Sequence, residues 1–254
     1  MLDFFFTTSI PDTMRFQSFG IWHGLYILTP ALAIWLIIWM CRHKSPEENT
    51  KLLRAFTWAL PVMYLHRFTV FALLDYHVEP QMPFLDRLPL QLCTMNAIIM
   101  PIAVKTRMKF LLNYIYGICL PGAAAAMLTP AMSYYGKYAP FSWQVFFFFL
   151  DHALMAFVPI FAVSTGFFRP DIRYAPKILG IFGIYAACMY PLNKLLDQNF
   201  LFLNYPDQGT VMAFFASYLG NPGYLLPLAG MVVFIVGLLF LPWYLYREST
   251  NKTI

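Results

Sequence analysis

The stretch LLPLAGMVVFIVGLLFLPWYL (225–245) contains no charged residue. A helix needs about 20 mostly apolar residues to cross the hydrocarbon core of a bilayer, and this stretch meets that length. Six further apolar stretches of comparable length precede it, so the sequence predicts seven spans within one domain (1–254). Their expected bounds are 17–41, 52–75, 88–105, 109–129, 141–166, 174–196 and 222–246. The predicted fold is an all-α, polytopic transmembrane bundle.

The composition agrees with a protein dissolved in lipid. Hydrophobic residues make up 60% of the chain and charged residues 11%, which leaves too little polar surface for a water-soluble globule. Alternation of polar and apolar residues with a period of two is absent, so a closed β-barrel is not expected. The formal charge of +5 reflects the loops of a membrane protein, and we expect no nucleic-acid partner. The cysteines show no metal-binding spacing, and neither a metal nor a cofactor is expected.

One polar segment lies between the last two predicted spans. It reads FLFLNYPDQGTVMAFFASYLGNPG (200–223), and it is amphipathic around Met212–Leu219. Such a segment is typical of a helix that lies in the membrane interface, or of a re-entrant segment, over about 200–221.

Lysine and arginine residues predict the orientation of the bundle. Cytoplasmic loops of membrane proteins carry an excess of these residues, and twelve of the seventeen in this chain fall in connections that would share one side. These twelve are Arg42, Lys44, Lys51, Arg54, Lys105, Arg107, Lys109, Arg169, Arg173, Lys177, Arg247 and Lys252. The expected topology therefore places the N-terminus outside and the C-terminus in the cytoplasm.

Ionisable and polar groups within the predicted spans are candidate functional residues, because such groups are costly in lipid. With about 1.5 Å of rise per residue, the topology places them in the outer half of the bilayer, in a polar pocket covered by loops 76–87 and 130–140. The candidates are His23, His66, Arg67, Gln91, Cys93, Asn96, Thr129, His152, Asn193 and Asn204.

Cys93 and His152 are the pair among these that could carry covalent chemistry. A thiol activated by an imidazole base forms acyl intermediates. Two other interpretations remain open, namely that Cys93 is a small buried residue and that His152 is a structural histidine. We expect His23 and His66 to orient groups or to contact a head group, and Arg67 to pair with a nearby aspartate or to bind a lipid phosphate.

Several motifs resemble one family. LPLQLC (88–93) resembles the Leu-Pro-Leu-His/Gln-Leu-Cys signature of the YwaF-like bacterial integral membrane proteins, which are related to eukaryotic transmembrane protein 164. Further similar segments are NYIYGICLPGAAAAMLTP (113–130), FFFFLDHALM (146–155), Asn193 with NFLFLNYP (199–206), and GNPGYLLP (220–227).

This resemblance implies a phospholipid acyltransferase of the bacterial cytoplasmic membrane, acting on phospholipids or lysolipids. In the eukaryotic relatives the cysteine that matches Cys93 carries the acyl group, and His152 is the matching histidine. A donor for the oxyanion is also required. Gln91, Asn96 or a backbone N–H near Pro89 could supply it.

Two other classes of function fit the same residues. In a transporter or an ion-binding membrane protein, His23, His66, Arg67 and His152 would line a cavity. In an assembly partner, the polar groups would bind a helix of another protein.

Overall fold

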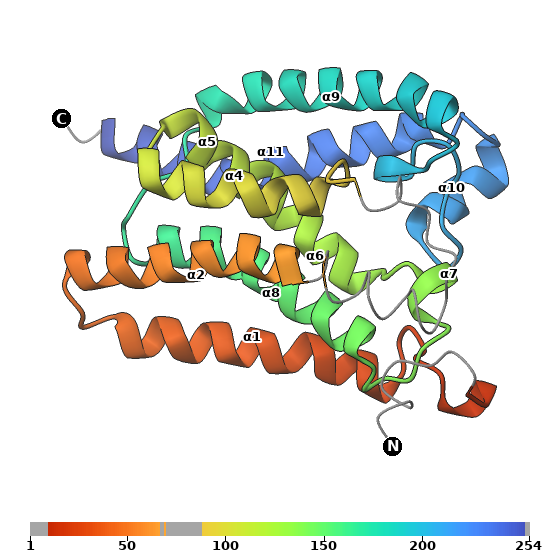
Figure 1. Cartoon of the computed structure of the whole chain (residues 1–254). Coiled ribbons are helices and arrows are strands. Elements are labelled where there is room, and N and C mark those ends of the chain that lie inside the picture. Colours follow the sequence, from red (N-terminus) through yellow and green to blue (C-terminus); the bar gives the residue numbers. More distant parts are fainter. Residues whose placement is uncertain (1–9, 67–68, 70–87, 252–254) are drawn as a thin grey trace.

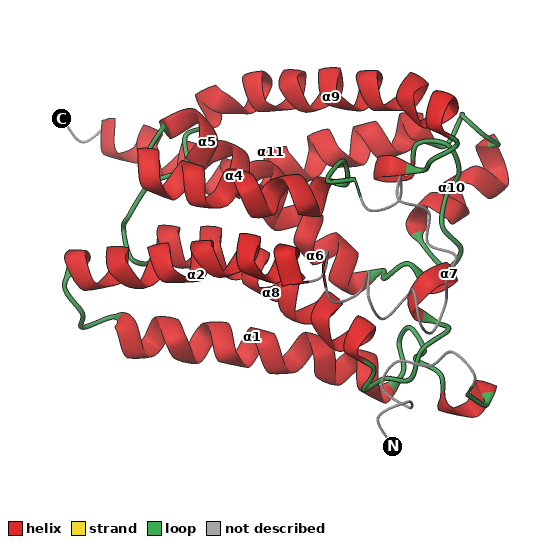
Figure 2. Ribbon diagram, viewed as in Figure 1, coloured by secondary structure: helices red, strands yellow, loops and turns green. Residues whose placement is uncertain are grey.

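The computed structural model describes residues 10–66, 69 and 88–251, and throughout this part of the chain the regular structure is helical (Figures 1 and 2). The long elements are α1 (Ile21–Cys41), α2 (Pro46–His66), α4 (Leu92–Thr106), α8 (Trp143–Ser164), α9 (Ala175–Leu196), α11 (Leu225–Asn251), and the continuous run of α5 (Lys109–Tyr114), η5 (Ile115–Cys119) and α6 (Leu120–Leu128). The short ones are η2 (Asp12–Met14), α7 (Met132–Tyr135), η6 (Ile172–Tyr174), η7 (Phe200–Phe202) and α10 (Val211–Leu219).

The expected membrane spans correspond closely to these helices. Among the described residues, five helices are long and apolar enough to cross a membrane: Ile21–Cys41, Lys109–Leu128, Trp143–Ser164, Ile172–Leu196 and Leu225–Tyr246. The span expected at 88–105 is the shorter apolar helix α4, and most of positions 67–75 of the span expected at 52–75 lie outside the described residues. The chain is therefore a multi-pass membrane protein, and the number seven and the orientation stay predictions.

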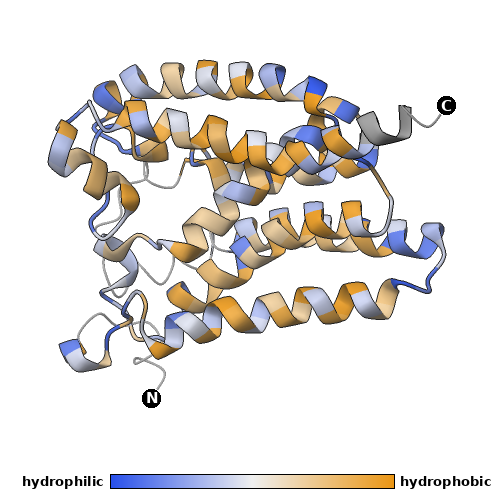
Figure 3. Cartoon of the chain, turned by 180° about the vertical axis from the view of Figure 1, so that it is seen from behind, coloured by the Kyte–Doolittle hydropathy of each residue, from blue (hydrophilic) through white to orange (hydrophobic). Residues whose placement is uncertain are grey.

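α8 lies at the centre of the bundle and α1 on its outside. Fourteen residues of α8 are buried, whereas only His23 and Cys41 are buried in α1. Leu32 and Trp35 of α1 are each 63% exposed. Hydrophobic residues run along the outer helices, and hydrophilic ones gather at helix ends and connections (Figure 3). An outer surface of this kind requires lipid as its solvent.

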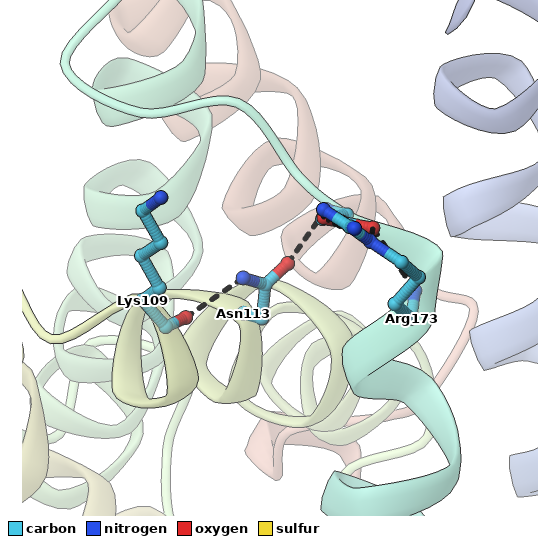
Figure 4. Close-up of polar contacts among 4 residues, drawn as sticks. Lys109, Asn113 and Arg173 are labelled. Atoms are coloured by element: carbon cyan, nitrogen blue, oxygen red, sulfur yellow. Dashed lines mark hydrogen bonds and ion pairs between the residues drawn. The ribbon is translucent and has the colours of Figure 1, made fainter.

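The connections rich in lysine and arginine lie at one end of the bundle (Figure 1). They also contact one another, since the guanidinium carbon of Arg107 lies 4.7 Å from the ring centre of Phe167 and Lys177 Nζ lies 5.2 Å from that of Phe110. The Oδ1 atom of Asn113 accepts the backbone N–H of Asp171 at 2.8 Å (Figure 4). These basic segments are therefore far apart in the sequence but lie together in the structure.

The helix that runs from α5 to α6 contains a π-helical turn, η5, against α9 and α11. A Cβ atom on Gly117 would lie 2.7 Å from Ile178 Cδ1 and 2.8 Å from Phe240 Cε2. Tyr116 donates its hydroxyl hydrogen to Leu239 O at 3.0 Å. Only glycine allows this close approach of three helices, and π-turns of this kind are frequent near functional sites.

The segment expected to be interfacial or re-entrant (200–221) consists of η7, a loop and α10. Asn193 fixes η7 to α9, because its Nδ2 donates to Phe200 O at 2.8 Å and its Oδ1 accepts from Phe200 N at 2.9 Å. No residue of α10 is buried. The short helix expected around Met212–Leu219 is present, and its place in a membrane interface stays a prediction.

Candidate functional site

A cavity of about 830 Å³ lies among α4, α6, α8, α9 and α11. This volume is in the range typical of ligand pockets, about 300–1,000 Å³. Its walls are mostly leucine, alanine, valine and phenylalanine side chains. Most of its lining residues lie in the halves of these helices away from the basic connections, and Leu179, Phe182 and Gly183 of α9 extend it towards them. Among the predicted site residues it is lined by Gln91, Cys93, Asn96, Thr129 and His152.

Cys93 occupies the first turn of α4. The helix begins at Leu92, and the side chain of the preceding residue, Gln91, binds η7 and the residue before it. Its Oε1 accepts from Leu201 N at 3.0 Å and its Nε2 donates to Asn199 O at 3.5 Å. The Gln91 side chain consequently does not cap α4, although the Gln91 backbone carbonyl accepts from Met95 N at 3.1 Å and from the Thr94 hydroxyl at 2.9 Å. A helix N-terminus carries partial positive charge, which stabilises a thiolate in its first turn.

His152 lies in the middle of α8 and is 3% exposed. Its Nδ1 atom lies 2.8 Å from the carbonyl oxygen of Phe148, one turn earlier in the same helix. A carbonyl oxygen can only accept, so Nδ1 carries the hydrogen, and in the neutral ring Nε2 holds the lone pair. The backbone of α8 thus selects the tautomer in which Nε2 can act as a base.

His23 lies outside the lining of the cavity. It is 3% exposed, and both ring nitrogens have partners: Nε2 donates to Met127 O at 2.8 Å, and Nδ1 accepts from Phe19 N at 2.8 Å. Its ring packs against Phe16 and Phe149. These contacts join the start of α1 to the end of α6, which is what a structural histidine does.

His66, Arg67, Asn193 and Asn204 do not form part of the described cavity wall. His66 packs its ring against Trp143 and Phe147, and its Nε2 has no hydrogen-bond partner among the described residues. Arg67 lies outside the described residues. Asn204 Nδ2 donates to Gln198 O at 2.6 Å, so this side chain, like that of Asn193, stabilises the segment around η7.

Thr129 and Asn96 both line the cavity, but their side chains differ in hydrogen bonding. Thr129 donates its hydroxyl hydrogen to Ala125 O at 2.9 Å, within its own helix. Asn96 is 2% exposed, and the structure gives its side-chain amide no hydrogen-bond partner among the described residues. Of these two polar groups, Asn96 has its full hydrogen-bonding capacity available to a ligand.

The cavity also includes tyrosines that the sequence did not single out. Tyr134 and Tyr135 of α7 lie in the loop 130–140 that was expected to cover the pocket, and Tyr64 and Tyr190 come from α2 and α9. Tyrosine is common at the ends of membrane helices for reasons unrelated to a site. The residue type alone therefore did not indicate that these tyrosines line a cavity. For Tyr134 and Tyr135, the position of loop 130–140 did.

Comparison with known proteins places the chain in one family. No curated protein and no solved structure matches it. The TMEM164 family matches residues 14–248, which include every described residue that lines the cavity. The resemblance to transmembrane protein 164 is thereby confirmed, while membership of a YwaF-like group stays a prediction. The chain belongs to the TMEM164 family.

Proposed function

We propose that this protein is a membrane-embedded lipid acyltransferase or lipid esterase in which Cys93 carries the acyl group as a thioester. The observation that carries this proposal is that Cys93 and His152, from two different helices, line the same apolar cavity. Membership of the TMEM164 family supports it, since the matched residues 14–248 include both positions.

The proposed reaction has two halves. His152 Nε2 takes the proton of the Cys93 thiol, and the thiolate attacks the carbonyl carbon of a phospholipid ester. The tetrahedral intermediate expels the glycerol oxygen, which receives the proton from His152 and leaves as the hydroxyl of a lysolipid. The hydroxyl of a second lysolipid, or water, then gives its proton to His152 and attacks the thioester, which releases the acylated product and restores the thiol.

The acyl chain would occupy the part of the cavity between α9 and α11. This part of the wall includes small residues, and Gly183, Ala187 and Ala229 are exposed as well as being part of it. An apolar chain could therefore pass between these helices from the surrounding lipid without exposing its methylene groups to water.

The proposed location is the cytoplasmic membrane of a bacterium, with the site facing the outer leaflet. Cys93 and His152 line the cavity from the halves of α4 and α8 away from the basic connections, and the rule that positive residues face the cytoplasm would place these halves outside. Phospholipids and lysolipids of the outer leaflet would then be the substrates.

A transporter remains the second class of function that the sequence suggested. It required His23, His66, Arg67 and His152 to line one cavity, and of the described residues in that set only His152 does. A transport pathway also needs polar groups towards both sides of the membrane. The polar residues Gln91, Asn96, Thr129 and His152 that line the cavity lie towards the ends of their helices away from the basic connections, which favours the acyltransferase.

The thioester can be tested directly in the protein reconstituted in vesicles of palmitoyl-containing phosphatidylethanolamine. We expect intact-protein mass spectrometry to detect one palmitoyl adduct that hydroxylamine removes, and peptide mapping to place it on Cys93. Cys93→Ser should lose this thioester. Cys188→Ser is the matched control, because Cys188 is exposed on α9 and does not line the cavity.

Lipid analysis of the same vesicles shows whether a lysolipid or water accepts the acyl group in the second half of the reaction. Exchange of acyl chains between a phospholipid and an added lysolipid would identify a transferase, and release of free fatty acid an esterase. An adduct that persists in Cys93→Ser, or acyl exchange that does not depend on Cys93, would overturn the proposal.

A further inference from the structure

We propose that the side-chain amide of Asn96 binds the oxyanion of the tetrahedral intermediate that forms on Cys93, at the N-terminus of α4. This inference rests on the proposed function and adds a catalytic residue to it. From sequence, Gln91, Asn96 or a backbone N–H near Pro89 could have supplied such a donor, and the contacts of the described residues distinguish the two side chains.

The Gln91 amide is already occupied. Its Oε1 accepts from Leu201 N and its Nε2 donates to Asn199 O, so both of its polar atoms bind η7 and the residue before it. Movement of this side chain towards a substrate would leave the Leu201 N–H without its acceptor. Gln91 therefore positions the start of α4 and is a poor oxyanion donor.

The Asn96 amide is uncommitted although it is buried. The residue is 2% exposed, its Oδ1 has no partner among the described residues, and neither has its Nδ2. Most buried polar side-chain atoms in folded proteins are hydrogen-bonded, and an exception requires an explanation. Because Asn96 lines the cavity, an oxygen of the ligand can accept from its Nδ2, while its Oδ1 can accept from a hydroxyl of the ligand or from water.

The position of Asn96 in α4 suits this role. Residues three apart in a helix lie on the same face with their Cβ atoms about 5–6 Å apart, so Asn96 follows Cys93 by one turn, and both line the cavity. The carbonyl oxygen of an ester attacked by Cys93 would thus lie near two sources of positive charge. These are the Nδ2 hydrogens of Asn96 and the first turn of α4, which Gln91 does not cap.

The experiment compares two reactions of the same thiol. Formation of the palmitoyl thioester from phosphatidylethanolamine passes through an oxyanion, whereas alkylation by N-hexadecyl iodoacetamide substitutes at a saturated carbon and forms none. In Asn96→Leu, which keeps a similar volume, we expect thioester formation to slow by about 100- to 1,000-fold and alkylation of Cys93 to stay within about twofold of the wild-type rate.

Gln144→Leu is the matched control. Gln144 is likewise buried, at 3% exposure, with an Oε1 that has no partner among the described residues, but it does not line the cavity. We expect both reactions to proceed normally in this variant. Asn96→Asp, of almost the same shape, provides a second test, because its carboxylate offers no donor and should also slow only thioester formation.

The outcomes are separable from those of the proposed function. Wild-type protein that forms no thioester would overturn both proposals. A thioester that forms at the wild-type rate in Asn96→Leu and Asn96→Asp would overturn the role of Asn96 alone. Equal loss of alkylation and thioester formation in both variants would assign Asn96 to packing around Cys93 and would also overturn its role as an oxyanion donor.

Discussion

His152 donates its Nδ1 hydrogen to the carbonyl oxygen of Phe148, which precedes it by one turn in α8, at 2.8 Å. The imidazole is therefore oriented by the backbone of its own helix. Asp151, its neighbour in sequence, lines a separate and smaller chamber together with Gln144, as expected for adjacent residues that point about 100° apart on a helix. The residue that fixes the tautomer could not be identified from sequence, because every helical residue has a carbonyl four positions earlier.

The first prediction concerns His152 as the base for Cys93. In His152→Gln we expect the rate of Cys93 alkylation by N-hexadecyl iodoacetamide to fall by about 100-fold or more, which is the usual contribution of a general base. The rate is measured by mass spectrometry of the labelled peptides. Cys188 in the same variant is the internal control, since it is exposed on α9. Unchanged reactivity of Cys93 would remove His152 from the proposed dyad.

The sequence predicted the position of each site residue along its helix better than it predicted the direction of its side chain. Apolar length and the distribution of lysine and arginine give each residue a position along its helix, and this brought Cys93, His152, Gln91, Asn96 and Thr129 to one cavity. The direction of a side chain around the helix axis depends on packing between helices, which sequence patterns do not specify in a helix that is apolar on all sides.

His23 illustrates the difference. Its position near the start of α1 was consistent with the pocket, but its ring faces Met127 O and Phe19 N, and the aromatic rings of Phe16 and Phe149 surround it. Asn193 is a second case, since both polar atoms of its side-chain amide are hydrogen-bonded to the backbone of Phe200. Both are buried polar residues satisfied within the protein, which is the commoner reason for a polar group in a membrane helix.

The second prediction concerns the close approach of helices at Gly117. In Gly117→Ala the added Cβ would clash with Ile178 Cδ1 and Phe240 Cε2, and we expect a loss of about 1–3 kcal/mol in the free energy of unfolding, as for other overpacked cores. Thermal unfolding in detergent measures the effect. Gly237→Ala in α11 is the control, because nothing lies within 4 Å of its added Cβ. Equal stability of the two variants would mean that α9 and α11 can move apart freely.

The third prediction concerns pH and the start of α2. The backbone N–H and the hydroxyl of Ser45 both donate to Glu48 Oε2 at 2.8 Å, and these bonds lower the pKa of the Glu48 carboxyl. A carboxylate with a lowered pKa stabilises the folded protein above its ordinary pKa in the unfolded chain, and this contribution is lost as the pH falls through the lower value in the folded protein. The capping box of α2 should therefore weaken in acid.

Ser45→Ala tests this dependence. We expect the variant to have a lower melting temperature than the wild type near neutral pH, and the difference to narrow as the pH falls below about 4, the ordinary range of glutamate. Glu47→Gln is the control, since Glu47 makes only an exposed ion pair with Lys51, which contributes little. A difference between Ser45→Ala and wild type that stays constant with pH would contradict the role of the Glu48 carboxylate.

The fourth prediction concerns the length of the acyl chain. Gly183 lines the cavity, and a Cβ added there meets no atom within 4 Å, so a larger side chain can extend into the space between α9 and α11 without disturbing the helix. In Gly183→Leu we expect the protein to accept short acyl chains normally and to transfer palmitoyl chains about tenfold more slowly, because the side chain occupies volume that the end of a long chain needs.

Gly180 provides a close comparison for Gly183. It lies one turn earlier in α9, also has no atom within 4 Å of an added Cβ, and does not line the cavity. Gly180→Leu should therefore leave the ratio of palmitoyl to octanoyl transfer unchanged, with both chains supplied in phosphatidylethanolamine and products measured by lipid mass spectrometry. If both variants shift this ratio alike, the substitution acts through α9 as a whole. A shift in Gly183→Leu alone would locate the acyl chain between α9 and α11.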